Sequence, residues 1–297
     1  MSSKARRPPA NGRRFGIWGL GFVWDLGFGI WDLSFLWCLV LGVWCFSLPL
    51  CFAQKQPDRP PPLDPVQAVA EARSLVAELL AQKPAENSTN SGVLRIRDAN
   101  GQEREIAVRF EIFSNGTNWF SAYEADLVGT RSTASLNTPR RLKLTVIHAD
   151  NTPNRYELIG LGGSAATNAA PRRLTGNEAM IPFAGSDFWL ADLGLEFFHW
   201  PNQRLLRKEI RHSKSCDVLE SINPQPGSGG YARVVTWITL DDPHGIVHAD
   251  AYDARGELLK QFDPTELKKI RGQRQLVEME MRNRQTGSHT WIRFNLE

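Results

Sequence analysis

The chain has 297 residues, and its 35 basic and 32 acidic side chains give a net charge of +3 at pH 7. Five basic and two acidic residues within the first 53 account for this excess, so the rest of the chain carries equal numbers of both signs. Such a balance excludes the strong positive field that attracts nucleic acid, and the length permits one large β domain.

Residues 1–53 are predicted to be an export signal. Basic residues precede an apolar stretch from Leu33 to Phe46, and the helix-breaking Pro49 stands shortly before Ala53, after which we expect cleavage. A retained membrane anchor is the alternative interpretation of the same segment. The domain that follows is expected in the periplasm, either free or tethered to the inner membrane.

Cys216 is the only cysteine after residue 53, because Cys38, Cys45 and Cys51 all lie in the predicted signal. After cleavage the chain cannot form an intramolecular disulfide, so its apolar core must hold it together. Residues 54–65, "QKQPDRPPPLDP", are typical of an extended proline-rich linker. The folded domain is predicted to span residues 66–297 as a monomer.

The segment "DPVQAVAEARSLVAELLAQK" predicts a helix at the start of this domain. Asp64 is placed to cap it, and Pro65 suits its first turn. The apolar residues that recur near helical spacing are Val66, Val69, Leu75, Val76, Leu79 and Leu80.

From Gly92 onward the apolar period changes to two, which is typical of β-strands. Strands are predicted in "EIAVRFEIF", "RLKLTVIH", "YARVVTWITL", "GIVHADAY", "ELLKQFD", "QLVEMEM" and "HTWIRFNL", with turn residues such as Asn100-Gly101 and Arg255-Gly256 between them. We predict a mainly β fold, one large antiparallel sheet with few helices. Such a sheet must curl, close or bury its apolar face against something else.

The stretch 160–180 is rich in small and polar residues and predicts a loop. It leads into "SDFWLADLGLEFFHW", residues 186–200, whose many apolar side chains follow no clean period. We interpret this segment as a short helix and turns laid over the sheet.

Two short motifs could indicate nucleotide binding or a serine nucleophile, but the sequence around them does not support either function. Gly160, Gly162 and Ala165 match a nucleotide fingerprint, but no long helix follows, so a flexible loop is favoured. Ser164 and Ser186 lack the full G-x-S-x-G pattern of a nucleophile elbow.

Two histidine clusters also receive a structural interpretation. His212 and Cys216 could bind zinc on a helix, but their segment predicts two strands with a packed thiol between them. His248, Asp250 and Tyr252 share one strand face, which we interpret as a solvated polar face rather than an acid-base group. No catalytic residue, metal site or cofactor is predicted.

The basic cluster "ELKKIRGQR" is the one notable positive patch. It contains Lys268, Lys269, Arg271 and Arg274 but no interleaved aromatic residues for stacking on bases. It is interpreted as a solvated turn, with contact to an anionic membrane surface as the alternative.

The C-terminal half resembles the LolA-like family of outer membrane lipoprotein-sorting proteins, in its broad bacterial branch. The motifs that carry the resemblance begin with Gly185-Ser186-Asp187-Phe188 and Asp192-Leu193. They continue in order through "CDVLESINP", "YARVVTWI" with Trp237, "AYDARGELLK" with Lys260, and "MEMRNRQTGSHTWIRF" with Met279, Asn283, Thr286, Gly287 and Thr290. The resemblance covers roughly residues 66–297. The long loop 160–180 departs from the family pattern, and the arginine of the better-known carriers' lid has no identifiable counterpart.

The resemblance implies a strongly curved antiparallel sheet, an unclosed β-barrel, whose opening is covered by helices. It also implies a periplasmic, non-enzymatic carrier whose partners are the acyl chains of a lipoprotein or lipid. We predict that Val108, Phe110, Ile112, Leu142, Leu144 and Val146 line the hollow, and that Phe188, Trp189, Leu193 and Phe197 form its lid. For each of these residues, the alternative interpretation is that its side chain packs in a closed hydrophobic core and lines no cavity.

Two other functions remain open from the sequence. The first is a membrane-tethered envelope module that binds a protein partner, such as an envelope membrane protein, and carries no lipid. The second is a hydrolase that uses His248 and Asp250.

Overall fold

The computed structural model describes residues 63–84, 86–116, 118–127, 140–150, 152–162, 170–270 and 273–296. The predicted signal and most of the linker lie outside these ranges, as do Ser164, Ala165 and Arg271. Residues 60–297 form one compact unit. None of the helices within the described ranges has the length and apolar character needed to cross a bilayer.

The first element is the predicted helix, α1 (Pro65–Ala81). The Asp64 carboxylate accepts hydrogen bonds from the backbone N–H groups of Val66 (2.9 Å) and Gln67 (3.2 Å), and Pro65 occupies the first turn, where no N–H is needed. The buried face of α1 consists of Ala68, Ala72, Leu75 and Val76.

In the described part of the chain, thirteen strands follow and form a single antiparallel sheet. They are β1 (Ser88–Arg97), β2 (Glu103–Ser114), β3 (Asn118–Asp126), β4 (Arg141–Ala149), β5 (Arg155–Leu161), β6 (Arg172–Thr175), β7 (Asn202–Arg211), β8 (Lys214–Ile222), β9 (Arg233–Thr239), β10 (Ile246–Tyr252), β11 (Leu258–Ile270), β12 (Gln273–Asn283) and β13 (His289–Asn295).

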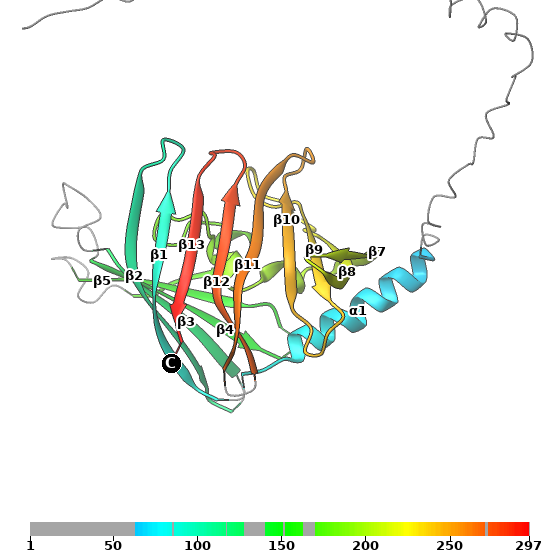
Figure 1. The fold of residues 1–297 in the computed structure, drawn as a ribbon, viewed down its shortest axis with the longest axis horizontal. Helices are drawn as coiled ribbons and strands as arrows, with labels where there is room; N and C mark the ends of the chain where they lie inside the picture. Colours follow the sequence, from blue (N-terminus) through cyan, green and yellow to red (C-terminus); the bar gives the residue numbers. More distant parts are fainter. Residues whose placement is uncertain are drawn as a thin grey trace, which may run out of the picture. The chain divides into compact units, whose positions relative to one another are not determined.

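The chain builds this sheet as two meanders joined in the middle. The strand order is β6-β5-β4-β3-β2-β1-β13-β12-β11-β10-β9-β8-β7, so β1 pairs with β13 while β6 and β7 are the two edges. The sheet is strongly curved, with β3 and β4 passing behind β1 and β13 in Figure 1. This is the predicted unclosed β-barrel.

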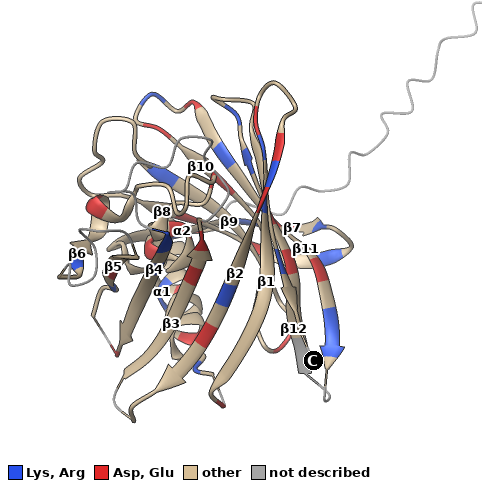
Figure 2. Ribbon diagram, turned by 90° about the vertical axis from the view of Figure 1, so that its left-hand side faces the viewer, with Lys and Arg blue, Asp and Glu red and all other residues tan. Residues whose placement is uncertain are grey.

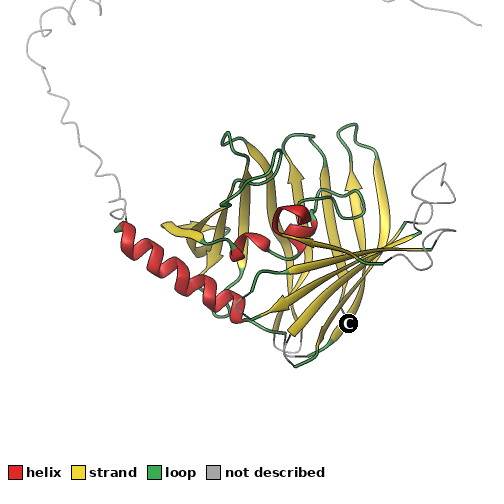
Figure 3. Cartoon of the chain, turned by 180° about the vertical axis from the view of Figure 1, so that it is seen from behind, coloured by secondary structure: helices red, strands yellow, loops and turns green. Residues whose placement is uncertain are grey.

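One connection must cross from one edge strand to the other, and it carries the remaining short helices. These are η2 (Gly176–Ala179), α2 (Leu190–Leu193) and η3 (Glu196–His199). Seen from behind, the short helical turns lie within the curve of the sheet while α1 runs along one side (Figure 3). We call residues 176–200 the lid.

The stretch 160–180 is more regular than predicted. It includes the end of β5, the short strand β6 and η2, although residues 163–169 lie outside the described ranges. Glu178 explains part of this order, because its carboxylate accepts a hydrogen bond from the backbone N–H of Thr175 at 3.1 Å and so fixes the start of η2.

Candidate functional site

The lid lies against the concave face of the sheet and joins two apolar clusters. Phe188 and Leu193 pack with the side chains of β1–β5 and β12–β13, whereas Phe197 packs with α1 and the strands β7–β11. Trp189 is half-buried and packs against the second cluster. The four residues that we predicted to form the lid therefore all pack against the two apolar clusters.

Five of the six predicted sheet residues meet the lid in the first cluster. Val108, Leu144 and Val146 are buried there, and the half-buried Phe110 and Leu142 pack against them. Ile112 lies further along β2, where it pairs with Ser121 and is half-buried. These side chains share the face that the lid covers.

Asp187 fixes the central part of the lid to the β12–β13 hairpin. Its buried carboxylate accepts hydrogen bonds from Thr290 Oγ1 (2.7 Å), Ser288 Oγ (2.6 Å) and Asn283 Nδ2 (3.1 Å). Charge-assisted bonds of this kind are among the stronger polar contacts in a protein. They hold this part of the lid in place without any covalent link.

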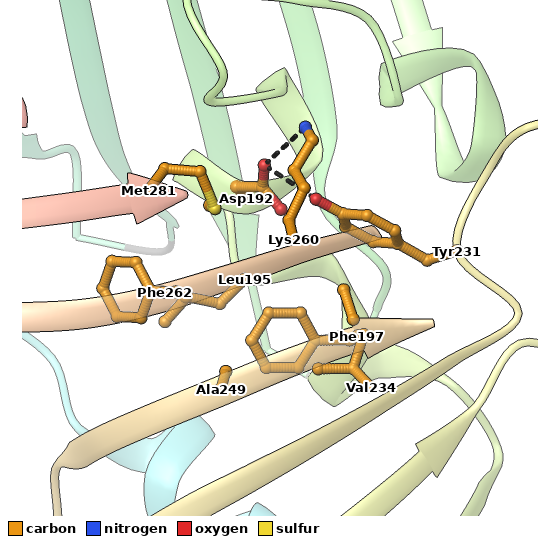
Figure 4. Close-up of a pocket in the computed structure, with 10 residues that line it drawn as sticks. Asp192, Leu195, Phe197, Tyr231, Val234, Ala249, Lys260, Phe262 and Met281 are labelled. Carbon is orange, nitrogen blue, oxygen red and sulfur yellow. Dashed lines mark hydrogen bonds and ion pairs between the residues drawn. The ribbon is translucent and has the colours of Figure 1, made fainter. Parts of the chain in front are cut away.

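Lys260 of β11 holds the middle of the lid. Its ammonium donates to the carbonyl oxygen of Asp187 at 2.6 Å, lies 3.5 Å from the centre of the Trp189 ring and is 3.7 Å from the Asp192 carboxylate. The side chain of Lys260 is 3% exposed. Figure 4 shows Lys260 and Tyr231 both directed at Asp192. The Tyr231 hydroxyl donates to this carboxylate at 3.2 Å.

Burial shifts both members of this ion pair toward their neutral forms. It lowers the pKa of Lys260 to about 8, and the charges of Asp192 and Asp187 oppose that shift. Burial also raises the pKa of Asp192, against the opposing charge of Lys260. A cation kept in an apolar hollow in this way depends on the partners that the lid supplies.

Glu196 of η3 anchors the far end of the lid to β5. The Tyr156 hydroxyl donates to Glu196 Oε2 at 2.8 Å, and both side chains are buried. Burial raises the pKa of Glu196 to about 7, although the hydrogen bond from Tyr156 favours the ionised form. Nearby, Asn154 Nδ2 donates to the carbonyl oxygen of Gly194 at 2.6 Å.

A small cavity remains between the lid and the strands β9–β12. Its volume is about 30 Å³, which is room for about one or two water molecules. Apolar side chains surround most of it, while Lys260, Asp192 and Tyr231 form its polar end (Figure 4). In this closed arrangement the aromatic side chains of the lid occupy the hollow themselves.

The outer face of the sheet holds a second polar cluster, which corrects one sequence interpretation. His248 is buried rather than solvated, because its two ring nitrogens lie 2.9 Å from Asp250 Oδ1 and 2.6 Å from Asp263 Oδ1. Burial alone lowers the pKa of His248, but the bonds and charges of the two carboxylates outweigh it and raise that pKa. The partner on the next strand, Asp263, was not visible in the local pattern.

The structure also shows where most of the other residues considered in the sequence analysis lie. His212 lies in the turn between β7 and β8, and Cys216 is a buried free thiol on β8, as the two-strand interpretation predicted. Lys268 and Lys269 belong to strand β11 rather than to a turn. Within the described ranges, no group of three or more His, Cys, Asp or Glu side chains could hold a metal ion.

Acidic and basic positions are interspersed over the strands (Figure 2).

We compared the sequence and the fold with those of known proteins. A family model described as "Uncharacterized protein" matches residues 167–296, which contain the lid and β6–β13. None of the curated proteins matches the chain in sequence.

Solved structures match over most of the domain. A putative outer membrane lipoprotein-sorting protein domain from Vibrio parahaemolyticus has a TM-score of 0.61 at 17% identity, covering 77% of this chain and 92% of that one. A DUF1329 family protein from Desulfovibrio piger has a TM-score of 0.58 at 20% identity, covering 78% and 92%. A LolA superfamily protein from Nitrosomonas europaea has a TM-score of 0.50 at 16% identity, covering 79% and 93%. The fold is therefore LolA-like, and the predicted fold class is confirmed.

The structure gives a physical reason for the motif series that suggested this fold. Asp187 meets Asn283 and Thr290, and Asp192 meets Lys260, although these residues are far apart in the sequence. Several of the motif residues thus make the polar contacts that hold the lid to the sheet. From the sequence we predicted only apolar side chains at the site, and the roles of Tyr156, Glu196 and Tyr231 were not foreseen.

Proposed function

We propose that this domain binds acyl chains of a lipoprotein or lipid between the lid and the concave face of the sheet, as a non-enzymatic periplasmic carrier in lipoprotein sorting. The main support for this proposal is how little structure covers the concave apolar face of the sheet. Within the described residues, the concave apolar face is covered by the connection 176–200 and, at one side, by α1, where a globular domain would use a full second layer of structure.

The lid is suited to exchange with a ligand. Phe188, Leu193 and Phe197 fill the hollow, and the lid is held by separate polar contacts at Asp187, Asp192 and Glu196. Because the remaining cavity is about 30 Å³, an acyl chain can enter only if the lid moves away. Each methylene removed from water contributes about 0.8 kcal/mol, so a chain of ordinary length can compensate for displacing these side chains.

The test is native mass spectrometry with lipid extraction, on protein purified from the periplasm of cells that express the full chain. We expect co-purified acyl lipid or acylated protein, and we expect Phe188→Asp to reduce its amount while the fold is kept. A ligand-free mass that also fails to take up added acyl lipid would contradict the carrier function. It would favour the envelope interaction module instead.

A further inference from the structure

Lys260 is a buried cation whose closest partners belong to one segment, while the ring of Tyr231 lies further away at 5.5 Å from the ammonium. The ammonium contacts the carbonyl oxygen of Asp187, the ring of Trp189 and the carboxylate of Asp192, and these three residues lie within the lid. On the side of the sheet, Lys260 shares the wall of the cavity with Tyr231, Phe262 and Met281. If the lid moves away, Lys260 loses every one of these contacts in a single step.

The wall of the cavity beside Lys260 is polar at one end and apolar elsewhere, as a site for an amphiphile would be. Lys260, Asp192 and Tyr231 lie at one end (Figure 4). The rest of the wall is apolar and consists of Leu195, Phe197, Val234, Ala249, Ala251, Phe262 and Met281. An extended molecule with one polar end and one apolar end matches this wall once the lid residues leave it.

The buried charge restricts what that polar end can be. A wholly apolar ligand would cover the ammonium and leave it without a counter-charge, which is strongly unfavourable in an apolar hollow. An anionic group at the place of the Asp192 carboxylate would restore the ion pair. The Tyr231 hydroxyl, which donates to Asp192 at 3.2 Å in the closed arrangement, would be free to donate to the same anion.

We infer that Lys260 and Tyr231 form a binding site for the anionic head group of an acyl amphiphile, a carboxylate or a phosphate, which replaces Asp192 when the lid is displaced. This inference rests on the proposed acyl-binding function and adds a ligand class to it. The site selects anionic amphiphiles over neutral ones with the same chain.

The experiment compares three probes with the same sixteen-carbon chain: hexadecanoate, hexadecyl phosphate and hexadecanol. Their affinities are measured at pH 7.5 by isothermal titration calorimetry on the purified protein. We expect wild type to bind at least one of the anionic probes about tenfold or more tightly than hexadecanol, as a charge-assisted contact in a buried site implies. Whichever anion shows the preference identifies the head group as carboxylate or phosphate.

The key variant is Lys260→Met combined with Asp192→Asn, which removes both charges together. It should lose the anion preference while keeping or gaining affinity for hexadecanol. Lys268→Met, on the same strand but 54% exposed at its side chain, is the matched control and should keep the preference. Tyr231→Phe keeps the ring and should reduce the preference several-fold, so it provides a second test if the double variant does not fold.

Three results would overturn the inference. Equal affinity of wild type for hexadecanol and both anions would exclude the head-group site but leave acyl binding intact. An anion preference that survives in the folded double variant would place the anion elsewhere. A failure to bind all three probes would contradict the acyl-binding function itself, together with this site.

Discussion

The Tyr156 hydroxyl of β5 donates a 2.8 Å hydrogen bond to the Glu196 carboxylate of η3, and this bond joins the end of the lid to the sheet. Both side chains are buried, so the carboxylate is ionised at a cost in free energy. The contact links the position of the lid to a group whose pKa is raised to about 7.

Glu196→Gln should therefore change the pH dependence of stability. Because the pKa of Glu196 is raised from 4.5 to about 7 on folding, its favourable contribution is complete below about pH 4.5 and is lost as pH rises through about 7. The variant keeps an acceptor for Tyr156 but cannot ionise. Its free energy of unfolding should exceed that of wild type above pH 7, by at most about 3 kcal/mol.

Urea unfolding of both proteins between pH 5 and pH 8 measures this difference. Subtracting the two curves removes the contributions of the other titrating groups. A difference that stays constant over this range would show that Glu196 ionises normally in the folded protein.

Gly194→Ala should weaken the same end of the lid by steric means. A Cβ atom at Gly194 would lie 2.8 Å from the ring carbons of Tyr156, closer than a real contact allows. Tyr156 must then shift away from Glu196, which should lower the free energy of unfolding by about 1–3 kcal/mol. Gly227→Ala is the control, because an added Cβ meets nothing within 4 Å there. Thermal unfolding of the two variants should differ clearly, and equal melting temperatures would contradict the close approach.

His248→Phe tests the buried cluster on the outer face. The variant leaves Asp250 and Asp263 without their shared partner and should lower the free energy of unfolding by about 2 kcal/mol near pH 6. The pKa of His248 is raised on folding, so its contribution is present below about pH 6.5 and is lost as pH rises through the folded pKa. The pKa values of both carboxylates are lowered, so their contribution is lost in acid as pH falls below about 4.

The stability gap between wild type and His248→Phe should thus be widest between about pH 4 and 6.5 and should narrow above that range. Denaturant unfolding at several pH values measures it. Since His248 lies on the opposite face from the lid, acyl binding should be unchanged in this variant. A variant that unfolds like wild type at pH 6 would show that the cluster contributes no net stability.

Much of the fold could be predicted from local pattern. The period of two in "EIAVRFEIF" predicted that Val108 and Phe110 share one face of a strand, as they do in β2, and Asp64 with Pro65 marked the start of α1. Strand β1 begins at Ser88, earlier than the apolar period suggested, because its first residues are polar and are held by pairing with β2. Backbone pairing of this kind leaves no signal in side-chain type.

The polar contacts of the site were much harder to predict. Lys260 and Asp192 meet only because the lid crosses between the two edge strands, and no local spacing encodes that approach. The burial of His248 has the same origin, since Asp263 comes from the neighbouring strand. The apolar cover was predictable from composition because "SDFWLADLGLEFFHW" is too apolar to face water.

Two phenylalanines on β2 allow a direct test of whether the acyl chain binds beneath the lid. Phe110 is half-buried on the concave face, 4.8 Å from the ring of Tyr123, whereas Phe113 lies 38% exposed and stacks on Phe120. Binding of a fluorescent acyl probe is measured for wild type, Phe110→Asp and Phe113→Asp, each verified as folded by circular dichroism. We expect wild type and Phe113→Asp to take up the probe and Phe110→Asp to bind it at least about tenfold more weakly, because a carboxylate in the hollow opposes apolar burial. Wild-type affinity in a folded Phe110→Asp variant would contradict the claim that the acyl chain binds beneath the lid.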